Sequence, residues 1–207
     1  MKMNDILRYL DILYPNPRCE LDYHKDYELL IAVMLSAQTT DKRVNMVTKE
    51  LFSKYDSLDK LAVADIDDIK NIIRSIGNYC KKANAIITIS KTLLDKYNGL
   101  VPPKRTALEA MPMVGRKTTN VVLSEWFKIP NIAVDTHVER VSKRLGIAKE
   151  KDSVLDVESK LKKKVPKDRW SKMHLQLVMF GRYHCTALKP HCDMCELKKI
   201  CKYQKKN

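Results

Sequence analysis

The stretch from Leu100 to Phe127 reads LVPPKRTALEAMPMVGRKTTNVVLSEWF, and it decides the fold class. Two prolines near its start prevent the preceding helix from continuing. Thr106 followed by Glu109 is typical of a capping box and predicts the start of a short helix. Pro112 ends that helix, and a second one is predicted from about Arg116. The stretch therefore predicts two helices joined by a tight turn.

Helical spacing of apolar residues continues on both sides of this stretch. Asn98-Gly99 predicts the C-terminal cap of the helix before it. The chain has 5 glycines and no alternating apolar segment long enough for a strand, so we expect an all-α protein. Three apolar faces carry this prediction: Val44, Val47, Leu51 and Tyr55; Ile66, Ile69, Ile73 and Ile76; and Ile86, Ile89, Leu93 and Tyr97.

The length and hydropathy of the chain exclude several classes of protein. At 207 residues it has room for one large or two small domains. Its longest apolar run, Leu29–Leu35, is far shorter than the roughly 20 residues that span a bilayer. The first 25 residues contain acids and no apolar core of a secretion signal. We expect a cytoplasmic protein that is not embedded in a membrane.

Positive charge is concentrated in the C-terminal third. The formal net charge is +14, yet residues 1–139 carry 20 basic and 18 acidic residues. Residues 140–207 carry 19 basic and 7 acidic residues, a net of +12. Such a basic region is typical of a protein that binds a polyanion, and nucleic acid is the leading candidate. The alternative is a set of solvated helix faces.

The turn at Pro112–Gly115 has a possible use in phosphate binding. A turn followed by a helix N-terminus presents unpaired backbone N–H groups and a positive dipole end to one point. A phosphate fits there without reference to base sequence. We expect Gly115 to provide the left-handed or closely approachable backbone that this requires. An ordinary connection between two helices is the alternative.

Lys117 and Asp135 are the candidate catalytic residues. Lys117 lies in the first turn of the second helix, where positive potential disfavours the ammonium form and favours the neutral amine of a Schiff-base nucleophile. Asp135 follows an apolar run and precedes a helical pattern, so it suits an N-cap. If Thr136 with Glu139 were the cap instead, Asp135 would be free for chemistry. Spacing leaves both alternatives open.

Four of the six cysteines form a C-x6-C-x2-C-x5-C pattern, namely Cys185, Cys192, Cys195 and Cys201. Without a secretion signal, a disulfide framework is not expected. Clustered thiols in such a chain indicate a metal centre, and their spacing suits zinc and an iron–sulfur cluster equally. Cys19 and Cys80 are isolated and are predicted to be small core residues.

Five features of the sequence occur together in one known family. They are Leu35–Asp41 (LSAQTTD), Met111–Thr118 (MPMVGRKT), the IAVDTHVER segment ending at Arg140, Gly181-Arg182 and the cysteine spacing. With these features the chain resembles the endonuclease III family of iron–sulfur helix-hairpin-helix DNA glycosylases, from about residue 5 to residue 204.

The resemblance implies an all-α, two-domain fold with a DNA-binding cleft between the domains. It implies a six-helix domain at 21–130 with the hairpin at about 107–127, and a cluster domain made of 1–20 and 131–207. It also implies a [4Fe–4S] cluster on the four cysteines. The expected partner is double-stranded DNA with damaged bases or abasic sites, bound by a monomer in the nucleoid of a prokaryote-type cell.

The family chemistry predicts a bifunctional glycosylase and abasic-site lyase that removes oxidised pyrimidines through a Lys117 Schiff base assisted by Asp135. Gln38 resembles the residue that fills the gap left by the flipped nucleotide. His137 and Arg140 are expected to shape the helix after Asp135 or to contact phosphate. The residues that the resemblance assigns to DNA contact are Gln38, Asn78, Tyr79, Val114, Gly115, Arg116, Thr118, His137, Arg140, Lys189 and His191.

Three positions depart from the family pattern. Met113 replaces the first glycine of the hairpin, which costs about 1–2 kcal/mol if that backbone has φ > 0. Asn78 stands where a bulky apolar wedge is common, although the neighbouring Tyr79 is a candidate wedge. Phe180 replaces a histidine before Gly181 and is expected to pack. Two other functions compete with this reading, namely the same scaffold tuned to another lesion or mismatch and a DNA-binding protein with a structural metal and no chemistry.

Overall fold

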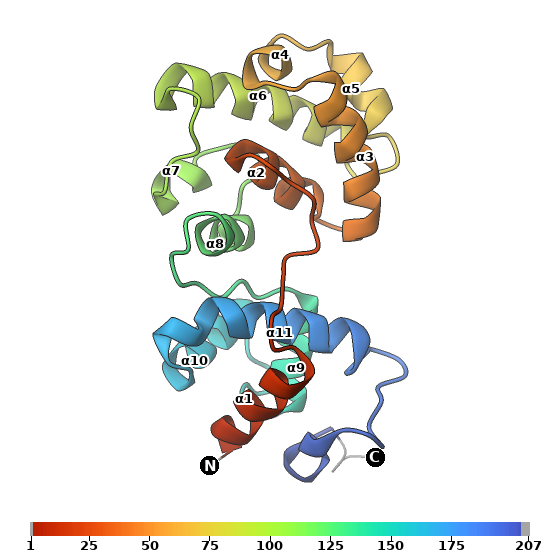
Figure 1. Cartoon of the computed structure of the whole chain (residues 1–207), viewed down its shortest axis with the longest axis vertical. Coiled ribbons are helices and arrows are strands. Elements are labelled where there is room, and N and C mark those ends of the chain that lie inside the picture. Colours follow the sequence, from red (N-terminus) through yellow and green to blue (C-terminus); the bar gives the residue numbers. More distant parts are fainter. Residues whose placement is uncertain (1, 204–207) are drawn as a thin grey trace. The chain divides into compact units, whose positions relative to one another are not determined.

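The computed structural model describes residues 2–203, and these residues form helices joined by turns, with no strand among them (Figure 1). This confirms the all-α prediction. None of the described helices combines the length and the apolarity needed to cross a membrane. The predicted C-terminal domain and the resemblance extend past residue 203, and that last part lies outside the described residues.

The helices are α1 (Lys2–Leu13), α2 (Asp26–Leu35), α3 (Asp41–Lys54), α4 (Leu58–Ala62), α5 (Ile66–Ile72), α6 (Tyr79–Tyr97), α7 (Arg105–Glu109), α8 (Arg116–Glu125), α9 (Thr136–Arg144), α10 (Val154–Lys164), η1 (Lys167–Arg169), α11 (Trp170–Tyr183) and η2 (Glu196–Ile200).

Contacts within the chain group it into two compact units. Residues 20–127 form the middle unit, and residues up to 19 together with those from 128 onward form the terminal unit. The middle unit contains α2 to α8, and the terminal unit contains α1 and α9 to η2. The N-terminal helix therefore belongs with the C-terminal third of the sequence.

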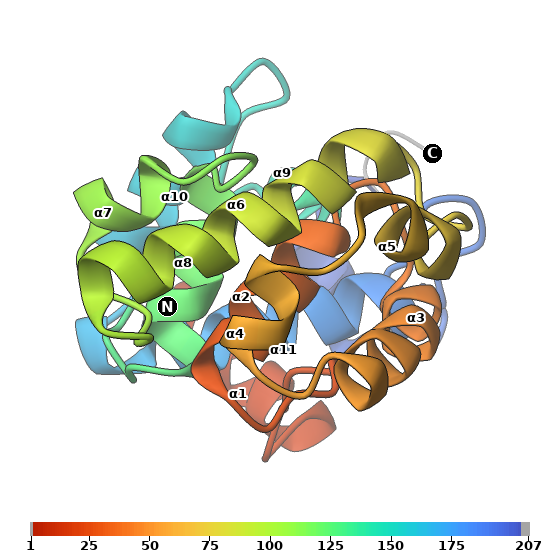
Figure 2. The ribbon, with the colours of Figure 1, turned by 90° about the horizontal axis from the view of Figure 1, so that it is seen from above.

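Helix α2 is the centre of the middle unit. The apolar run Leu29–Leu35, too short for a membrane, is buried along its whole length. A helix that is apolar on all sides must be surrounded by other elements. Accordingly, α2 contacts α3, α6 and α8, while α6 also packs against α4 and α5 (Figure 2).

The predicted end of α6 is confirmed. Asn98 and Gly99 both adopt left-handed backbone, with φ of 51° and 74°. The amide of Gly99 donates to the carbonyl of Leu93, which closes the helix end.

Two predicted details of the helices are wrong. The apolar face from Ile66 to Ile76 is not one helix, because α5 ends at Ile72 and the chain then forms tight turns in which the Ile76 amide donates to Ile73. Since a turn of three residues keeps both side chains on one face, Ile73 and Ile76 are still buried. The capping box at Thr106 is also absent: α7 begins at Arg105, and Glu109 pairs with Arg105 at 2.7 Å.

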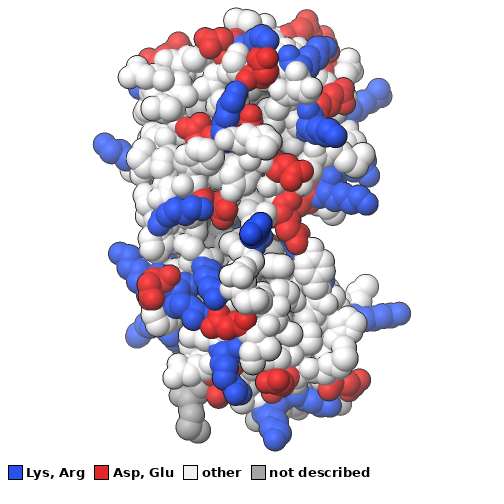
Figure 3. Space-filling model, in the orientation of Figure 1, with Lys and Arg blue, Asp and Glu red and all other residues white. Residues whose placement is uncertain are grey.

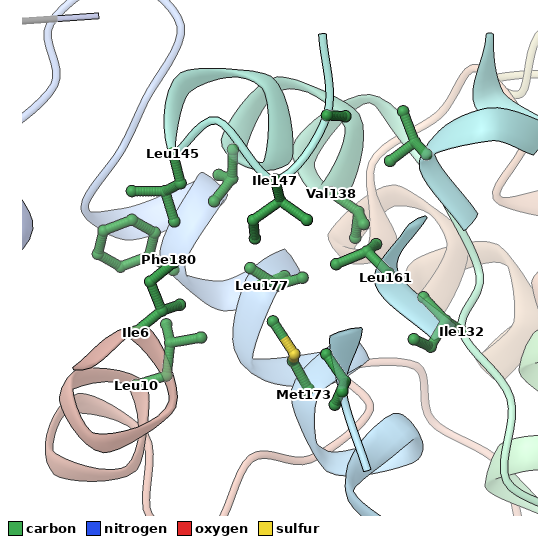
Figure 4. Packing of buried hydrophobic residues seen from close by; sticks show 14 of the residues in the cluster. Ile6, Leu10, Ile132, Val138, Leu145, Ile147, Leu161, Met173, Leu177 and Phe180 are labelled. Atoms are coloured by element: carbon green, nitrogen blue, oxygen red, sulfur yellow. The ribbon is translucent and has the colours of Figure 1, made fainter. Parts of the chain in front are cut away.

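The terminal unit has its own apolar core. It gathers side chains from α1, α9, α10 and α11, and most of them are almost fully buried (Figure 4). Phe180 belongs to this core, as predicted. Helices α9 and α11 cross closely at Gly181, where an added Cβ would lie 2.8 Å from the Cβ of His137. The glycine thus permits a contact that a larger residue would prevent. The labelled members of the core are Ile6, Leu10, Ile132, Val138, Leu145, Ile147, Leu161, Met173, Leu177 and Phe180.

Candidate active site and nucleic-acid interface

The turn between α7 and α8 is held by two buried side chains. Met111 and Val114 are each 4% exposed, and the Val114 amide donates to the Met111 carbonyl. Helix α8 then begins after Gly115, which has no side chain to cap it. The first bond along the helix runs from the Thr119 amide to the Gly115 carbonyl, so the preceding amides lie at the open helix end. The geometry of an anion-binding helix N-terminus is present.

The structure decides between the two alternatives expected for Gly115. Met113 has the left-handed backbone, with φ of 60°, while Gly115 has an extended backbone with φ of −97°. Gly115 therefore does not supply the left-handed conformation, and the close approach of a ligand to its backbone is the alternative that remains. A Cβ on Gly115 would meet nothing within 4 Å. The glycine instead leaves open space at the helix end.

The predicted residues of the hairpin divide by exposure. Arg116 and Lys117 are exposed, and they lie in the first turn of α8. The side chains of Val114 and Thr118 are buried, at 4% and 7% exposure. Only their backbone groups are therefore available to a ligand at this end of the helix.

Asp135 caps α9. One of its carboxylate oxygens, Oδ1, accepts hydrogen bonds from the amides of His137 and Val138 at 2.9 and 2.8 Å. This settles the alternative left open by spacing, because Thr136 is the first residue of the helix and does not cap it. Both bonds use the same oxygen, so Asp135 can cap the helix and still present Oδ2. The side chain is partly exposed.

Gln38 and Asn78 are brought together. They follow α2 and precede α6, and the side-chain amide of Asn78 donates to Oε1 of Gln38 at 3.4 Å. Both residues are exposed and both have φ of 60°. Asparagine tolerates this left-handed backbone better than a bulky apolar residue does, which gives Asn78 a local reason to stand at the wedge position. Tyr79, the alternative wedge, is partly buried as the first residue of α6.

His137 and Arg140 make structural contacts within the terminal unit. The Arg140 guanidinium donates to the carbonyls of Gly181 and Cys185 at 2.7 and 3.2 Å, and its Nη2 lies 3.2 Å from Nδ1 of His137. Burial lowers the pKa of His137, and the positive charge of Arg140 adds to that effect. Arg140 therefore joins α9 to the end of α11 and to the first cysteine of the pattern.

The four patterned cysteines line one pocket. The other residues that line this pocket include Arg144, Phe180, His184 and His191. No group of three or more His, Cys, Asp or Glu side chains in residues 2–203 is arranged to hold a single metal ion. Lys189 and His191, the predicted DNA contacts of this loop, are both exposed.

Arg144 is a residue of this pocket that the sequence did not indicate. Its Nη1 donates to the sulfur of Cys185 at 3.3 Å and to the carbonyl of Thr186 at 2.6 Å. Its guanidinium also lies over the ring of Tyr203, 4.1 Å from the centroid. Burial raises the pKa of the Cys185 thiol, and Arg144 opposes that shift by favouring the thiolate. Burial likewise raises the pKa of Cys195.

Lys82 is a second residue that sequence analysis missed. It is 1% exposed, and its ammonium donates to the carbonyls of Leu35 and Ala37 at 3.0 and 2.8 Å. The signal was available, because Lys82 is in helical phase with Ile86 and Ile89 on the apolar face of α6. A lysine at such a position is expected to be buried with partners.

Comparisons with known proteins place this site in a family. Residues 31–167 match the model of the HhH-GPD superfamily of base excision DNA repair proteins. The chain is 50% identical over 190 residues to the endonuclease III of Bacillus subtilis, covering 92% of this chain and 87% of that protein. It is 43% identical over 205 residues to the endonuclease III of Escherichia coli, covering 99% and 97%. The chain belongs to the HhH-GPD superfamily, in its endonuclease III group.

Solved structures agree with this assignment. A trapped covalent intermediate of endonuclease III with DNA matches with a TM-score of 0.95 and 48% identity, covering 100% of this chain and 98% of that one. A non-covalent endonuclease III–DNA complex matches equally well, with a TM-score of 0.95. A thermostable thymine-DNA glycosylase shares the fold, with a TM-score of 0.87 at 23% identity. The resemblance and the helix-hairpin-helix glycosylase fold are confirmed.

Proposed function

We propose that Lys117 and Asp135 carry the chemistry of a bifunctional DNA glycosylase and abasic-site lyase, which removes oxidised pyrimidines in base excision repair. The observation that carries this proposal is the exposed Lys117 amine in the first turn of α8, directly after the open turn at Gly115. A phosphate bound at the amides of this helix end would bring the sugar chain of DNA to the lysine.

The first chemical step is displacement of the damaged base. The base leaves the stack and enters a pocket, which costs less for a poorly stacked oxidised base. The Lys117 nitrogen then attacks C1′ of the sugar, and the bonding electrons leave with the base. The carboxylate of Asp135 stabilises the positive charge that develops on the sugar, or relays a proton. Its Oδ2 is suited to this because Oδ1 accepts both capping hydrogen bonds.

The second step breaks the strand. Opening of the sugar ring leaves C1′ joined to Lys117 as a protonated Schiff base, which acidifies the protons on C2′. Loss of one of them allows β-elimination, in which the C3′–O bond breaks and the 3′ phosphate leaves. Water then releases the sugar fragment from the lysine. Relatives that only remove a base usually lack this lysine, so Lys117 predicts the lyase activity.

Contacts with duplex DNA come from three sets of residues in this proposal. The backbone of Val114, Gly115 and Thr118, with the side chain of Arg116, holds phosphate at the hairpin. Gln38 fills the gap left by the flipped nucleotide, and Asn78 and Tyr79 contact DNA at the wedge position opposite the lesion. Lys189 and His191 contact phosphate from the exposed cysteine loop, whereas His137 and Arg140 act through the helix that begins at Asp135. The protein acts as a monomer in the cytoplasm, on the DNA of the nucleoid.

A [4Fe–4S] cluster on Cys185, Cys192, Cys195 and Cys201 completes the proposal. The donor set fits, since the four thiols line one pocket and four cysteine thiolates are the usual ligands of such a cluster. The Arg144 guanidinium at the Cys185 sulfur fits an anionic sulfur ligand. The cluster would supply structure rather than catalytic charge, because the lysine mechanism needs no metal. On this basis residues 131–207 with 1–20 are the cluster domain and 21–130 the hairpin domain.

The experiment that tests the proposal is borohydride trapping on a duplex with one abasic site. Wild-type protein should give a covalent adduct, and Lys117→Ala should give none. Lys96→Ala, which removes an exposed lysine of α6 in the same unit, is the matched control and should trap like wild type. An adduct that persists in Lys117→Ala would overturn the assignment of the nucleophile.

The same protein preparations separate the competing functions. Release of an oxidised pyrimidine from duplex DNA identifies the substrate, and release of a different base would indicate the scaffold tuned to another lesion. Tight DNA binding with neither base release nor an adduct would indicate a DNA-binding protein without chemistry. Iron content and visible absorbance test the cluster, and a colourless protein that contains zinc would refute it.

A further inference from the structure

Lys82 is a charged group buried where the proposed chemistry does not use it. It lies on α6 in the middle unit and is 1% exposed, and burial lowers the pKa of its ammonium. Burying a charge costs free energy, and apolar replacements of buried charges are often neutral or stabilising. Stability alone therefore gives a weak reason for a lysine at this position.

The contacts of Lys82 connect two loops. Its ammonium holds the carbonyls of Leu35 and Ala37, at the C-terminal end of α2 and directly before Gln38. Its backbone amide donates to the carbonyl of Asn78 at 3.1 Å, in the first turn of α6. One residue thus binds the backbone on both sides of the Gln38–Asn78 contact.

That contact needs such support, because one of its residues is strained. Gln38 and Asn78 both have φ of 60°, which asparagine tolerates but which costs an ordinary residue such as glutamine about 1 kcal/mol. Strained residues keep their conformation only where surrounding groups fix it. The fixed carbonyl of Ala37 is one peptide from Gln38, and the negative end of the α2 dipole favours the Lys82 ammonium there.

We propose that Lys82 is a positioning residue for damaged duplex DNA, which holds the loop of Gln38 in register with Asn78 so that the two side chains enter the duplex together. This rests on the proposed function, in which Gln38 fills the space of the flipped nucleotide and Asn78 stands at the wedge position. Lys82 itself does not touch DNA. Its effect passes through Gln38, and that coupling is measurable.

The binding experiment uses Lys82→Met, which keeps the length of the side chain and removes the donor. Dissociation constants are measured for a duplex with a stable tetrahydrofuran abasic site. We expect Lys82→Met to weaken binding roughly tenfold. Lys91→Met removes an exposed lysine farther along α6 and should change binding less than twofold. Equal effects of the two substitutions would overturn the proposal, because only charge loss would then matter.

A double-mutant cycle with Gln38→Ala tests whether Lys82 acts through Gln38. If it does, Gln38→Ala should cost little further affinity once Lys82→Met is present. Additive losses would contradict the proposal. If Lys82→Met does not fold, Lys82→Gln takes its place in every comparison. This substitution removes the charge, and its shorter side chain does not bring a donor to the two carbonyls. Wild-type DNA affinity in Lys82→Gln would also overturn the proposal.

Amide hydrogen exchange without DNA separates this proposal from the proposed function. Exchange at residues 36–40 should rise in Lys82→Met, including the Thr39 amide that donates to Ser36, while α8 stays protected. Unchanged exchange at residues 36–40 would refute positioning by Lys82 even if wild-type protein traps an abasic site. Conversely, if wild-type protein traps no abasic site but exchange at residues 36–40 rises as expected, the lyase function is refuted. The role of Lys82 in holding the loop of Gln38 would then still stand.

Discussion

The hairpin of the middle unit and the cysteine segment of the terminal unit are built in opposite ways. The hairpin is short and is anchored by buried Met111 and Val114 between two helices. Residues 185–203 are mostly exposed, with only Leu197 and Cys201 buried, and their one regular element is η2. Leu188 in this segment is 92% exposed and Met194 is 73% exposed.

The difference shows two ways of holding a surface segment. The hairpin is kept in place by apolar packing, which the chain supplies by itself. The cysteine segment buries little apolar surface, so we expect the proposed cluster to order it. Figure 3 shows one face of the molecule, on which basic and acidic side chains are interspersed rather than separated.

The largest expected effect is on the cysteine segment. Cys195→Ser should lose iron and expose residues 185–203 to hydrogen exchange, at a cost of about 5 kcal/mol or more. The middle unit should keep its protection, because its core contains none of the four ligands. Cys80→Ser in the middle unit is the control and should retain iron, because Cys80 is exposed and not the core residue that the sequence predicted. Full iron content in Cys195→Ser would contradict the idea that the cysteine segment, unlike the hairpin, depends on the cluster.

Two substitutions of Asp135 should separate its catalytic role from its role as a helix cap. Asparagine caps a helix as well as aspartate, so Asp135→Asn should change stability by less than about 0.5 kcal/mol. Base release should nevertheless fall by about 10²–10³-fold, since the charge that stabilises the developing cation is gone. Asp135→Ala should lose the same activity and a further ~1 kcal/mol of stability. Melting temperatures and single-turnover rates of both variants check this, and unimpaired base release by Asp135→Asn would leave the residue only a cap.

Acid should weaken the terminal unit through Asp11. Burial alone would raise its pKa, but hydrogen bonds from Lys172, Gln176 and Arg169 outweigh this and lower the pKa to about 2. A lowered pKa means that the stabilisation is complete above the normal value of 3.8 and is lost as pH falls toward about 2. After solvent screening we expect about 1 kcal/mol. Asp11→Asn should flatten unfolding free energy against pH over that window, and an unchanged slope would contradict the assignment.

The sequence predicted most of the helices and the class of enzyme. It did not predict the buried residues that hold the loops of the site in place. Apolar spacing correctly predicted α3 and α6, and Asn98-Gly99 correctly predicted the end of α6. In these helices most of the residues that follow the helical pattern are also buried. The end of α5 was missed because turns keep Ile73 and Ile76 buried without a helix. Spacing also left the cap of α9 undecided, since two adjacent residues suit it. The contacts of Arg144 and Lys82 join elements far apart in sequence, so no local pattern indicates their partners.

The smallest expected effects lie within the hairpin and separate its two special positions. Met113 already has the left-handed backbone, so Met113→Gly should relieve about 0.5–1 kcal/mol of strain and raise the melting temperature without changing DNA affinity. Gly115 has an extended backbone with open space beside it, so Gly115→Ala should fold normally. Its new methyl group would occupy the space at the helix end where the phosphate approaches, and affinity for duplex DNA should fall several-fold. Melting curves and binding titrations on both variants measure the two effects independently. The opposite result, with affinity changed by Met113→Gly and stability by Gly115→Ala, would mean that the strained residue rather than the open one forms the phosphate site.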